Sequence, residues 1–407
     1  MLYLRGAGGQ GLVTLDGLPV PDSLPGVIHL NALLPDGLQY VEVSRGFGPA
    51  SQPFSSHRGA IRMISRTALN NSGDLRIEGG TFGFLKETLR GNLANERAHL
   101  AITVTRSDAF DGAWHAQRSN NNPERDPFHD TQILTKAELD ISDDINWEAS
   151  LLYRKSRNGW DRYGIRRGVL AVVDDKHGFF AEEVWMVQSS VKAHLTDDWL
   201  TRLQLGYTQT RDRGRTMGLN LGYTTDFYLV RWENDQRLWR GESEDSVRLI
   251  WGGEGRHESA SGPTYAPIGP FTFAAGTPFS EARSQQAGFL ETRFAYGPLS
   301  GTVGVRYEAY DRFSNHALFQ AGVAWKLLPT LKFRANGGNG FRIPSYAERL
   351  YPLLGNLAIQ PERGAGGDVG LDWQPLSNLT LNLPRFYSRY DDFIIVTWNP
   401  QPRAQIP

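Results

Sequence analysis

Residues 337–363, GGNGFRIPSYAERLYPLLGNLAIQPER, form the stretch that decides the fold. The stretch is rich in glycine, proline, asparagine and aromatic residues, and strand-like segments flank it on both sides. On one side residues 331–335 alternate apolar and polar side chains, and on the other side residues 379–383 do the same. Alternation with a period of two is typical of a strand with one apolar and one polar face. The stretch is therefore predicted to be a long connection between two such strands.

The same alternation recurs along the chain from about residue 74. In residues 302–307, for example, Val303, Val305 and Tyr307 share one face and the intervening residues share the other. Roughly fifteen segments of this kind can be counted, since turn residues separate them. They begin near residues 74, 84, 97, 131, 145, 182, 198, 221, 236, 284, 299, 316, 329, 367 and 378.

The connections between these segments fall into two sets. The short, polar set comprises residues 142–144, 196–198, 233–235, 297–298, 328–329 and 375–378. The mostly long set comprises residues 108–130, 157–181, 212–220, 253–283 and 337–366, together with one compact connection at 311–315. The two sets alternate, as short periplasmic turns and longer extracellular loops do in transmembrane barrels. A β-sandwich gives no reason for every second loop to be long, so the pattern favours a barrel.

Tryptophans lie close to the short connections. Trp147, Trp199, Trp325 and Trp373 are each within a few residues of one of them. In a barrel these side chains would form an aromatic girdle at the membrane interface. For any one of them taken singly, an ordinary core tryptophan is the alternative.

Residues 1–73 differ from the rest of the chain, because they are glycine-rich and alternate less regularly. Strand-like runs occur at residues 12–15, 40–44 and 60–65, and the first is followed by Asp16-Gly17. An Asp-Gly pair after an apolar run is a strong turn signal. This segment is predicted to be a small mixed domain that precedes the barrel.

Composition excludes several classes of protein. The chain has 407 residues, no cysteine and a formal net charge of −1. The absence of cysteine rules out disulfides and thiolate metal sites, and the balanced charge offers no basic field for nucleic acid. No apolar run approaches the ~18 residues of a membrane helix. We recognise no arrangement of residues that points to catalysis, a resident metal or a cofactor, so an enzyme is not expected.

The stretch at 337–363 resembles a barrel segment of TonB-dependent outer-membrane receptors. In that family a GFR-x-P run leads through E-x-LY to GN and PE. The matching residues are Gly340-Phe341-Arg342, Pro344, Glu348, Leu350-Tyr351, Gly355-Asn356 and Pro361-Glu362. The N-terminal region resembles the plug domain of the same family in three further motifs. They lie at Leu4-Arg5-Gly6 with residues 12–20, at residues 41–46 with 49–51, and at residues 59–65.

The resemblance implies a fold in two parts. Residues 1–73 would be the C-terminal half of a small α+β plug domain. Residues 74–407 would be a partial all-β transmembrane barrel, with about fifteen of about twenty-two antiparallel strands. The chain would be an internal piece of a receptor that is truncated at both ends. It would lie in the outer membrane of a Gram-negative bacterium, in contact with the lipid.

The resemblance also implies a function. A receptor of this kind takes up a large, scarce nutrient, namely an iron–siderophore, haem or cobalamin, so its ligand is a metal chelate or a corrinoid. The energy would come from the TonB–ExbB–ExbD complex, acting through a segment that is missing here. The alternatives are a passive porin or adhesin-like barrel and a non-functional remnant of a receptor. A soluble carbohydrate-binding module or a barrel enzyme fits the loop pattern less well.

Two sets of site residues follow from the resemblance. Arg5 and Arg45 of the plug are expected to pair with the barrel carboxylates Glu362 and Asp368, since a planar guanidinium suits such pairing. The alternative is that both arginines stabilise the glycine turns beside them. Ligand contacts are expected from loop aromatic and charged residues on the outward side, and exposed residues without a ligand are the alternative. These are Trp114, His115, Trp160, Arg162, Tyr163 and Tyr351.

One acidic loop and one proline add further expectations. Glu124, Asp126, His129 and Asp130 provide oxygen and nitrogen donors that can hold a hard cation, but we interpret them as a solvated loop tip. Loop-bound calcium stays open. Pro384-Arg385 interrupts what should be a smooth strand, because proline is disfavoured in a paired barrel strand.

Overall fold

Fifteen strands form one antiparallel sheet, called here the large sheet, in which each strand pairs with the next along the chain. The computed structural model describes residues 3–4, 7–8, 12–20, 35–52, 59–110, 126–159, 161–166, 169–173, 175, 177–216, 219–242, 244–269, 272–350, 355–396 and 403–406. The strands of the large sheet are β7 (Ser72–Gly80), β8 (Phe84–Ala94), β9 (Ala98–Ala109), β10 (Phe128–Asp140), β11 (Ile145–Gly159), β14 (Phe179–Thr196), β15 (Trp199–Thr216), β16 (Leu219–Arg240), β17 (Ser246–Gly262), β20 (Phe279–Tyr296), β21 (Leu299–Tyr310), β22 (His316–Leu328), β23 (Leu331–Arg342), β24 (Glu362–Leu376) and β25 (Leu379–Asp391). The expected number of strands is confirmed.

The two faces of the large sheet are inverted relative to those of a water-soluble protein. On β21, Val303 and Tyr307 are 57% and 53% exposed on the outward face, whereas Arg306 and Glu308 are 1% and 0% exposed on the inward face. Apolar residues therefore face outward and charged residues face inward. This arrangement is typical of a barrel whose outer surface contacts lipid and whose interior is polar.

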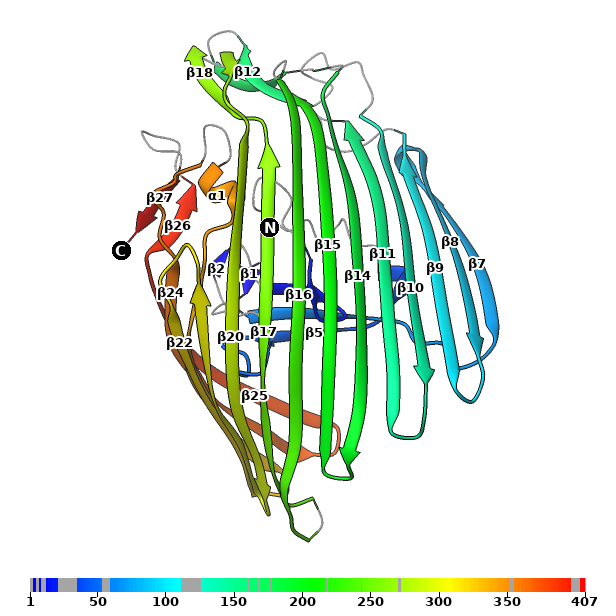
Figure 1. Cartoon of the computed structure of the whole chain (residues 1–407), viewed down its shortest axis with the longest axis vertical. Helices are drawn as coiled ribbons and strands as arrows, with labels where there is room; N and C mark the ends of the chain where they lie inside the picture. Colours follow the sequence, from blue (N-terminus) through cyan, green and yellow to red (C-terminus); the bar gives the residue numbers. More distant parts are fainter. Residues whose placement is uncertain are drawn as a thin grey trace.

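The short and long connections lie at opposite ends of the strands, as the sequence predicted (Figure 1). The long-connection end carries two small hairpins and one short helix. These elements are β12 (Arg162–Arg166) with β13 (Val169–Val173), β18 (Tyr265–Gly269) with β19 (Thr272–Ala275), and α1 (Tyr346–Leu350). Helix α1 lies within the stretch 337–363 quoted above, but β23 extends into that stretch as far as Arg342.

Two predicted connections were wrong. Residues 233–235 lie inside β16, and the actual turn follows Arg240. Most of 212–220 is also strand, because β15 continues to Thr216 and β16 begins at Leu219. Both segments contain polar residues, which are compatible with a strand wherever one face meets a polar interior and the other lies outside the apolar band. Polar composition therefore did not mark a turn here.

Pro384 lies within β25, opposite Gly370 of β24. β25 is the last strand of the large sheet, and no described strand pairs with its other side. Proline is tolerated on an edge strand because the ladder needs no amide donor on the open side. The interruption expected at Pro384 was therefore wrong, since β25 runs without a break from Leu379 to Asp391.

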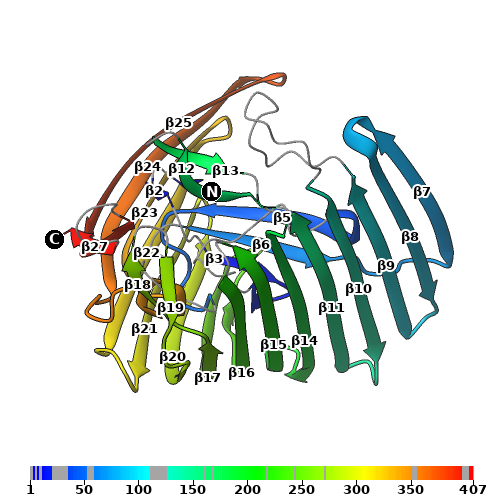
Figure 2. The same ribbon diagram turned by 90° about the horizontal axis from the view of Figure 1, so that it is seen from above.

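Four short strands form a second sheet, called here the inner sheet. It consists of β3 (Leu12–Leu15), β4 (Leu18–Pro19), β5 (Leu38–Arg45) and β6 (Gly59–Ser65), in the order β4-β3-β6-β5. β3 and β4 are joined by the predicted Asp16-Gly17 turn, where φ is +49° and +87°. Figure 2 shows the inner sheet within the curve of the large sheet. The large sheet stays open between β25 and β7 (Figure 2).

The remaining elements are short. They are β1 (Tyr3–Leu4) with β2 (Ala7–Gly8), β26 (Phe393–Val396) with β27 (Arg403–Ile406), and the 3₁₀ turns η2 (Pro35–Gly37) and η3 (Thr81–Gly83). None of the helices in the described part of the chain has the length and apolar character needed to cross a membrane.

Candidate functional site

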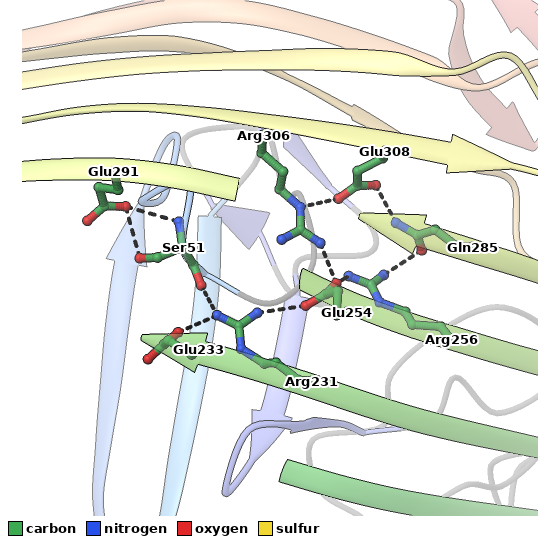
Figure 3. Close-up of polar contacts among 9 residues, drawn as sticks. All are labelled: Ser51, Arg231, Glu233, Glu254, Arg256, Gln285, Glu291, Arg306 and Glu308. Atoms are coloured by element: carbon green, nitrogen blue, oxygen red, sulfur yellow. Dashed lines mark hydrogen bonds and ion pairs between the residues drawn. The ribbon is translucent and has the colours of Figure 1, made fainter. Parts of the chain in front are cut away.

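The loop that follows β5, residues 46–52, is held by side chains of the large sheet and is called here the Ser51 loop. The Ser51 amide and hydroxyl both donate to Glu291 Oε2 of β20, at 3.0 and 2.9 Å. The Ser51 carbonyl accepts from the guanidinium of Arg231 on β16 (Figure 3). These two partners lie 240 and 180 residues further along the chain. Main-chain groups of Ser51 therefore carry much of this attachment.

Gln320 of β22 holds the same loop at a second point. In the orientation that gives both the nitrogen and the oxygen of its side-chain amide a partner, the nitrogen donates to the Gly48 carbonyl. In the same orientation the oxygen accepts from the Ala50 amide at 3.2 Å. The Cβ of Ala50 also lies against the large sheet, 2.6 Å from where a side chain on Gly304 would begin. Residue 304 must be glycine, or the loop must shift.

A buried charge cluster lies beside the Ser51 loop and is joined to it through Arg231 (Figure 3). Glu254 of β17 accepts from three guanidinium groups, with Arg231 Nη1 at 2.6 Å and with Arg256 and Arg306 as the other donors. Arg306 also pairs with Glu308 at 2.5 Å. Buried charges are tolerated only when paired and hydrogen-bonded. The cluster meets this requirement through neighbouring strands and leaves the loop resting on a polar, charged surface.

An apolar contact between the inner sheet and the large sheet complements this polar attachment. One continuous buried cluster joins residues of both sheets, and it comprises Val13, Leu15, Leu18, Ile61 and Met63 of the inner sheet with Leu134, Leu152, Val184, Met186 and Leu229 of the large sheet. Gly206 of β15 makes room for this contact, because a Cβ at that position would lie 2.1 Å from Leu18 Cδ2. Gln204 Nε2 adds a hydrogen bond to the Asp16 carbonyl at 3.2 Å.

The two barrel carboxylates predicted for ion pairs are both buried on β24. Glu362 accepts from Arg342 Nε at 2.8 Å and from the Ile394 amide at 2.6 Å. Asp368 accepts from Asn336 Nδ2 at 2.9 Å and lies 3.8 Å from Arg334 Nη1.

The two arginines predicted to pair with these carboxylates cannot be placed against them. Arg5 lies outside the described residues, and only the backbone of Arg45, at the end of β5, is described. Pairing of the two arginines with Glu362 and Asp368 stays a prediction.

Arg342 links the end of β23 to helix α1. Its Nη1 and Nη2 donate to the two oxygens of Glu348 at 2.7 and 3.0 Å, a bidentate contact that fixes both direction and distance. Arg283 lies 4.5 Å above the ring of Tyr346, whose hydroxyl donates to the Glu258 carbonyl at 3.0 Å. Burial raises the pKa of Tyr346 well above its usual range. The family-like motif thus anchors α1 at the long-connection end.

Most predicted ligand-contact residues cannot be placed. Trp114, His115, Trp160 and Tyr351 lie outside the described residues. Arg162 and Tyr163 belong to β12, whose backbone is described at the long-connection end, but nothing is described of their side chains. All six residues stay predicted ligand contacts.

The interpretation of Glu124, Asp126, His129 and Asp130 as a solvated loop tip was wrong for the residues that are described, because His129 and Asp130 lie in β10 and Asp126 and Asp130 are 6% and 0% exposed. Asp130 pairs with Arg154 at 2.7 Å and His129 pairs with Asp108 at 2.6 Å. Glu124 lies outside the described residues. Among the residues that the structure describes, no group of three or more acidic or histidine side chains is placed to hold a metal ion.

The charge cluster was missed by reasoning from the sequence, although the sequence carries a signal for it. Opposite charges recur two residues apart on four strands, at Arg231/Glu233, Glu254/Arg256, Glu291/Arg293 and Arg306/Glu308. Residues two apart on a strand face the same side, so each pair had to occupy one face. Which face that was, and which pairs meet, depended on the register of the sheet.

The chain matches a protein family described as "TonB dependent receptor-like, beta-barrel" over residues 65–406. It is 21% identical to the vitamin B12 transporter BtuB of Photobacterium profundum over 412 residues, covering 98% of this chain and 62% of the relative. It is 22% identical to the protein of the same name from Vibrio vulnificus (strain CMCP6), covering 97% of this chain and 61% of that relative. The chain therefore spans about three fifths of the length of these curated relatives.

Solved structures share the fold at low sequence identity. The siderophore receptor PiuA from Acinetobacter baumannii superimposes with a TM-score of 0.75 and 13% identity, covering 99% of this chain and 68% of that one. The open form of the ferric-catecholate import receptor Fiu from E. coli K12 gives a TM-score of 0.73 and 11% identity, covering 96% and 69%. These relatives are receptors and transporters and not enzymes. The chain belongs to the TonB-dependent receptor family, whose members lie in the outer membrane of Gram-negative bacteria.

Proposed function

We propose that this chain is part of an energised importer for a large, scarce nutrient of the iron–siderophore, haem or cobalamin type. In this proposal residues 1–73 are the C-terminal half of the plug domain, and residues 74–407 are part of the transmembrane barrel. The TonB–ExbB–ExbD complex supplies the energy through a segment outside this sequence. The ligand, a metal chelate or a corrinoid, binds at the long-connection end.

The attachment of the Ser51 loop is the observation that carries this proposal. A barrel wide enough to surround a separate domain needs that domain to fill its lumen. Polar groups hold the Ser51 loop, where water can replace hydrogen bonds that are lost on movement, while the apolar cluster around Leu18 holds another part of the inner sheet. Ser51 is held by Glu291 and Arg231, and Arg231 also pairs with Glu254 of the buried charge cluster.

The relatives support the substrate class and do not select one member of it. Two relatives that cover nearly the whole chain are named as vitamin B12 transporters, whereas PiuA and Fiu are named as siderophore and ferric-catecholate receptors. A corrinoid is therefore the first ligand to test, and ferric siderophores and haem follow. The loop residues Trp160 and Tyr163 are proposed ligand contacts, because aromatic side chains suit large planar or chelate-like molecules.

The test is uptake in a Gram-negative host that lacks its own cobalamin, haem and siderophore receptors and carries the gene in its natural context. Accumulation of radiolabelled cyanocobalamin, ferric siderophores and haem is measured with and without a functional TonB. Saturable accumulation of one ligand that requires TonB supports the proposal. Uptake that is independent of TonB indicates a passive barrel, and no uptake by a correctly inserted protein indicates a remnant.

A pair of variants tests the ligand contacts within the same assay. Trp160→Ala with Tyr163→Ala is expected to weaken ligand binding by about 2 kcal/mol, or roughly 30-fold, as loss of an aromatic hot spot does. The matched control is Trp325→Ala with Tyr307→Ala, which removes the same residue types from the outward face of the large sheet, where both side chains are exposed. Equal binding by both double variants would remove Trp160 and Tyr163 from the site.

A further inference from the structure

Strand β5 of the inner sheet runs across the inside of the large sheet and is attached at both of its ends (Figure 2). The Ser51 loop follows β5 and forms the attachment described above. The turn η2 precedes β5 and contacts a different part of the large sheet, formed by β8, β9 and β10. Between the two ends, Tyr40, Val41 and Val43 are half exposed, so few packing contacts hold the middle of the strand.

Asp36 makes the main contact of η2 with the large sheet. Its side chain is 6% exposed, and its carboxylate pairs with Lys86 Nζ of β8 at 2.6 Å. The other carboxylate oxygen lies 3.6 Å from Arg90 Nη2, and Arg90 Nε donates to the Asp36 carbonyl at 3.2 Å. The side chains of Lys86 and Arg90 are 15% and 18% exposed. Because they are partly shielded from water, these pairs are stronger than surface ion pairs.

Both cations have a second partner on β7. Lys86 Nζ lies 3.9 Å from Glu78, and Arg90 Nη1 donates to Asp74 at 3.0 Å. An unpaired charge inside the protein is the most costly result of breaking a buried ion pair. Neither cation becomes unpaired if Asp36 leaves, and the Asp36 carboxylate regains water. The contact can therefore open and close at moderate cost.

The turn η2 covers a row of uncharged polar side chains on the inward face. Lys86, Thr88 and Arg90 alternate along β8 and share this face, so the carboxylate that contacts both cations stands over Thr88. Thr88 lies opposite Thr105 of β9, and Thr105 lies opposite Gln132 of β10. Thr88, Thr105 and Gln132, called here the threonine row, are 0%, 0% and 2% exposed.

Two hydroxyl groups of the threonine row favour opening of the turn. The hydroxyl oxygens of Thr88 and Thr105 have no hydrogen-bond partner in the described part of the chain. A buried hydroxyl without a partner destabilises the state in which it is buried. Water, or a ligand with hydrogen-bonding groups, satisfies both hydroxyls once the turn moves away. The closed position of η2 is thus held by charge pairs and opposed by the row beneath it.

Gly37 sets how closely the turn approaches the large sheet. A Cβ at this position would lie 2.7 Å from Leu134 Cδ2 and 3.2 Å from Leu134 Cβ on β10. The Gly37 carbonyl accepts from the Arg66 amide at 3.0 Å. An alanine at position 37 would push the turn away from the sheet, or push Leu134 aside, without altering any charge.

We propose that η2 is a latch, which opens by release of Asp36 while the Ser51 loop stays attached, and that its opening uncovers the threonine row. The Ser51 loop is the more firmly held end, because its partners Glu291 and Arg231 are 0% and 5% exposed and Gln320 holds it at a second point. The inference rests on the proposed function in one respect, since transport requires the inner sheet to move. The latch directs that movement to the β8–β10 side.

Thiol labelling tests the latch directly, because the sequence contains no cysteine. Thr105→Cys places one thiol in the threonine row. Leu318→Cys places one beside the Ser51 loop, where Leu318 is buried and lines a cavity together with residues 47–50. The gene is expressed in its natural context, and the rate of labelling by N-ethylmaleimide is measured in isolated outer membranes. Label taken up by the protein without an introduced cysteine is subtracted.

The two thiols should respond to different substitutions. Asp36→Asn should accelerate labelling of Thr105→Cys by about tenfold, the usual effect of losing a hydrogen bond to a charged group. Labelling of Leu318→Cys should stay within about twofold, because well-separated sites act independently. Glu291→Ala should give the reverse result, with faster labelling of Leu318→Cys alone.

The matched control makes the same chemical change on β7. The Asp74 side chain is 50% exposed and pairs with Arg90, but it belongs to the large sheet and not to the turn. Asp74→Asn should therefore leave labelling of Thr105→Cys within about twofold of the unaltered rate, as for other exposed ion pairs.

Two results would overturn the proposal. The first is labelling of Thr105→Cys that Asp36→Asn does not change. The second is an equal rise at both thiols, which would mean that the inner sheet moves as one body. If Asp36→Asn does not fold, Gly37→Ala carries the same test, with an expected rise of at least about fivefold at Thr105→Cys, and an unchanged rate counts equally against the latch.

The latch and the proposed function fail separately. Labelling requires no transport, so a protein that labels as expected but imports none of the ligands supports the latch and refutes the proposed function. A protein that imports a ligand with TonB but labels equally with and without Asp36→Asn refutes the latch alone.

Discussion

Glu291 is the residue whose removal should loosen the Ser51 loop most directly. Its side chain is fully buried on β20 and accepts from both the amide and the hydroxyl of Ser51. Glu291→Ala removes this acceptor and leaves two buried donors without a partner. The loop is then expected to open more often, because its closed state has lost two hydrogen bonds to a charged group.

The size of the effect follows from these contacts. A hydrogen bond to a charged group contributes about 1.5–3 kcal/mol, so two such bonds give about 3 kcal/mol at the lower limit. The ion pair of Glu291 with Arg293 adds little, because Arg293 is half exposed and water screens it. Since 1.4 kcal/mol corresponds to a factor of ten, the opening equilibrium should rise by about 150-fold. Glu291→Gln keeps a neutral acceptor and should show roughly half of this free-energy change.

Amide hydrogen exchange of peptides that contain Ser51 measures this opening, because exchange reports local unfolding free energies. The control is Glu281→Ala on the same strand, where the carboxylate lies 3.5 Å from Arg312 and Arg349 and forms no hydrogen bond with Ser51. Exchange at Ser51 should accelerate in the Glu291 variant alone. Equal exchange in Glu291→Ala and in the unaltered chain, with the barrel folded, would refute the reasoning.

Three further substitutions test other parts of the structure. Gly206→Ala should weaken docking of the inner sheet by about 1–3 kcal/mol, because its Cβ would lie 2.1 Å from Leu18 Cδ2. In a double-mutant cycle measured by urea unfolding, Leu18→Ala should remove most of this cost. Strictly additive effects of the two substitutions would contradict the clash. Val303→Arg places a charge on the exposed outward face and should lower the free energy of unfolding in lipid bilayers by about 2–4 kcal/mol. An unchanged free energy of unfolding would mean that Val303 does not face lipid. Asp16→Ala removes the carboxylate that accepts from the Ser65 amide at 3.0 Å and from the Ser65 hydroxyl at 2.7 Å. Hydrogen exchange of the Ser65 amide should then accelerate by at least about tenfold. Retained protection of this amide would show that the turn does not depend on this carboxylate.

Much of the fold could be predicted because its determinants are local. Alternation in residues 302–307 indicated a strand, and β21 has its apolar residues on one face and its charged residues on the other. The Asp16-Gly17 pair indicated a turn because few other residues adopt positive φ angles, and both have them. The interpretation was wrong at 233–235, since polar residues in a membrane barrel also occur in the middle of a strand.

The candidate site could be predicted only in part. Glu362 and Asp368 were predicted as barrel carboxylates that pair with Arg5 and Arg45; the structure shows both buried on β24, where Arg342 and Asn336 of the adjacent strand contact them. The pattern of paired charges two residues apart was present in the sequence and did not reveal which face it occupied. A side chain's face follows from alternation, whereas its partner follows from register.

The sequence by itself determined that the chain makes many short-period strands, with short and long connections at alternate ends, and a small glycine-rich domain before them. Only the tertiary structure decided that Ser51 meets Glu291, 240 residues away along the chain, and that Arg157 and Arg213 flank Ala181 on three neighbouring strands. The physical reason is that propensity, period and turn chemistry act over a few residues. Contacts between distant strands depend on the curvature and register of the whole sheet, which no local segment specifies.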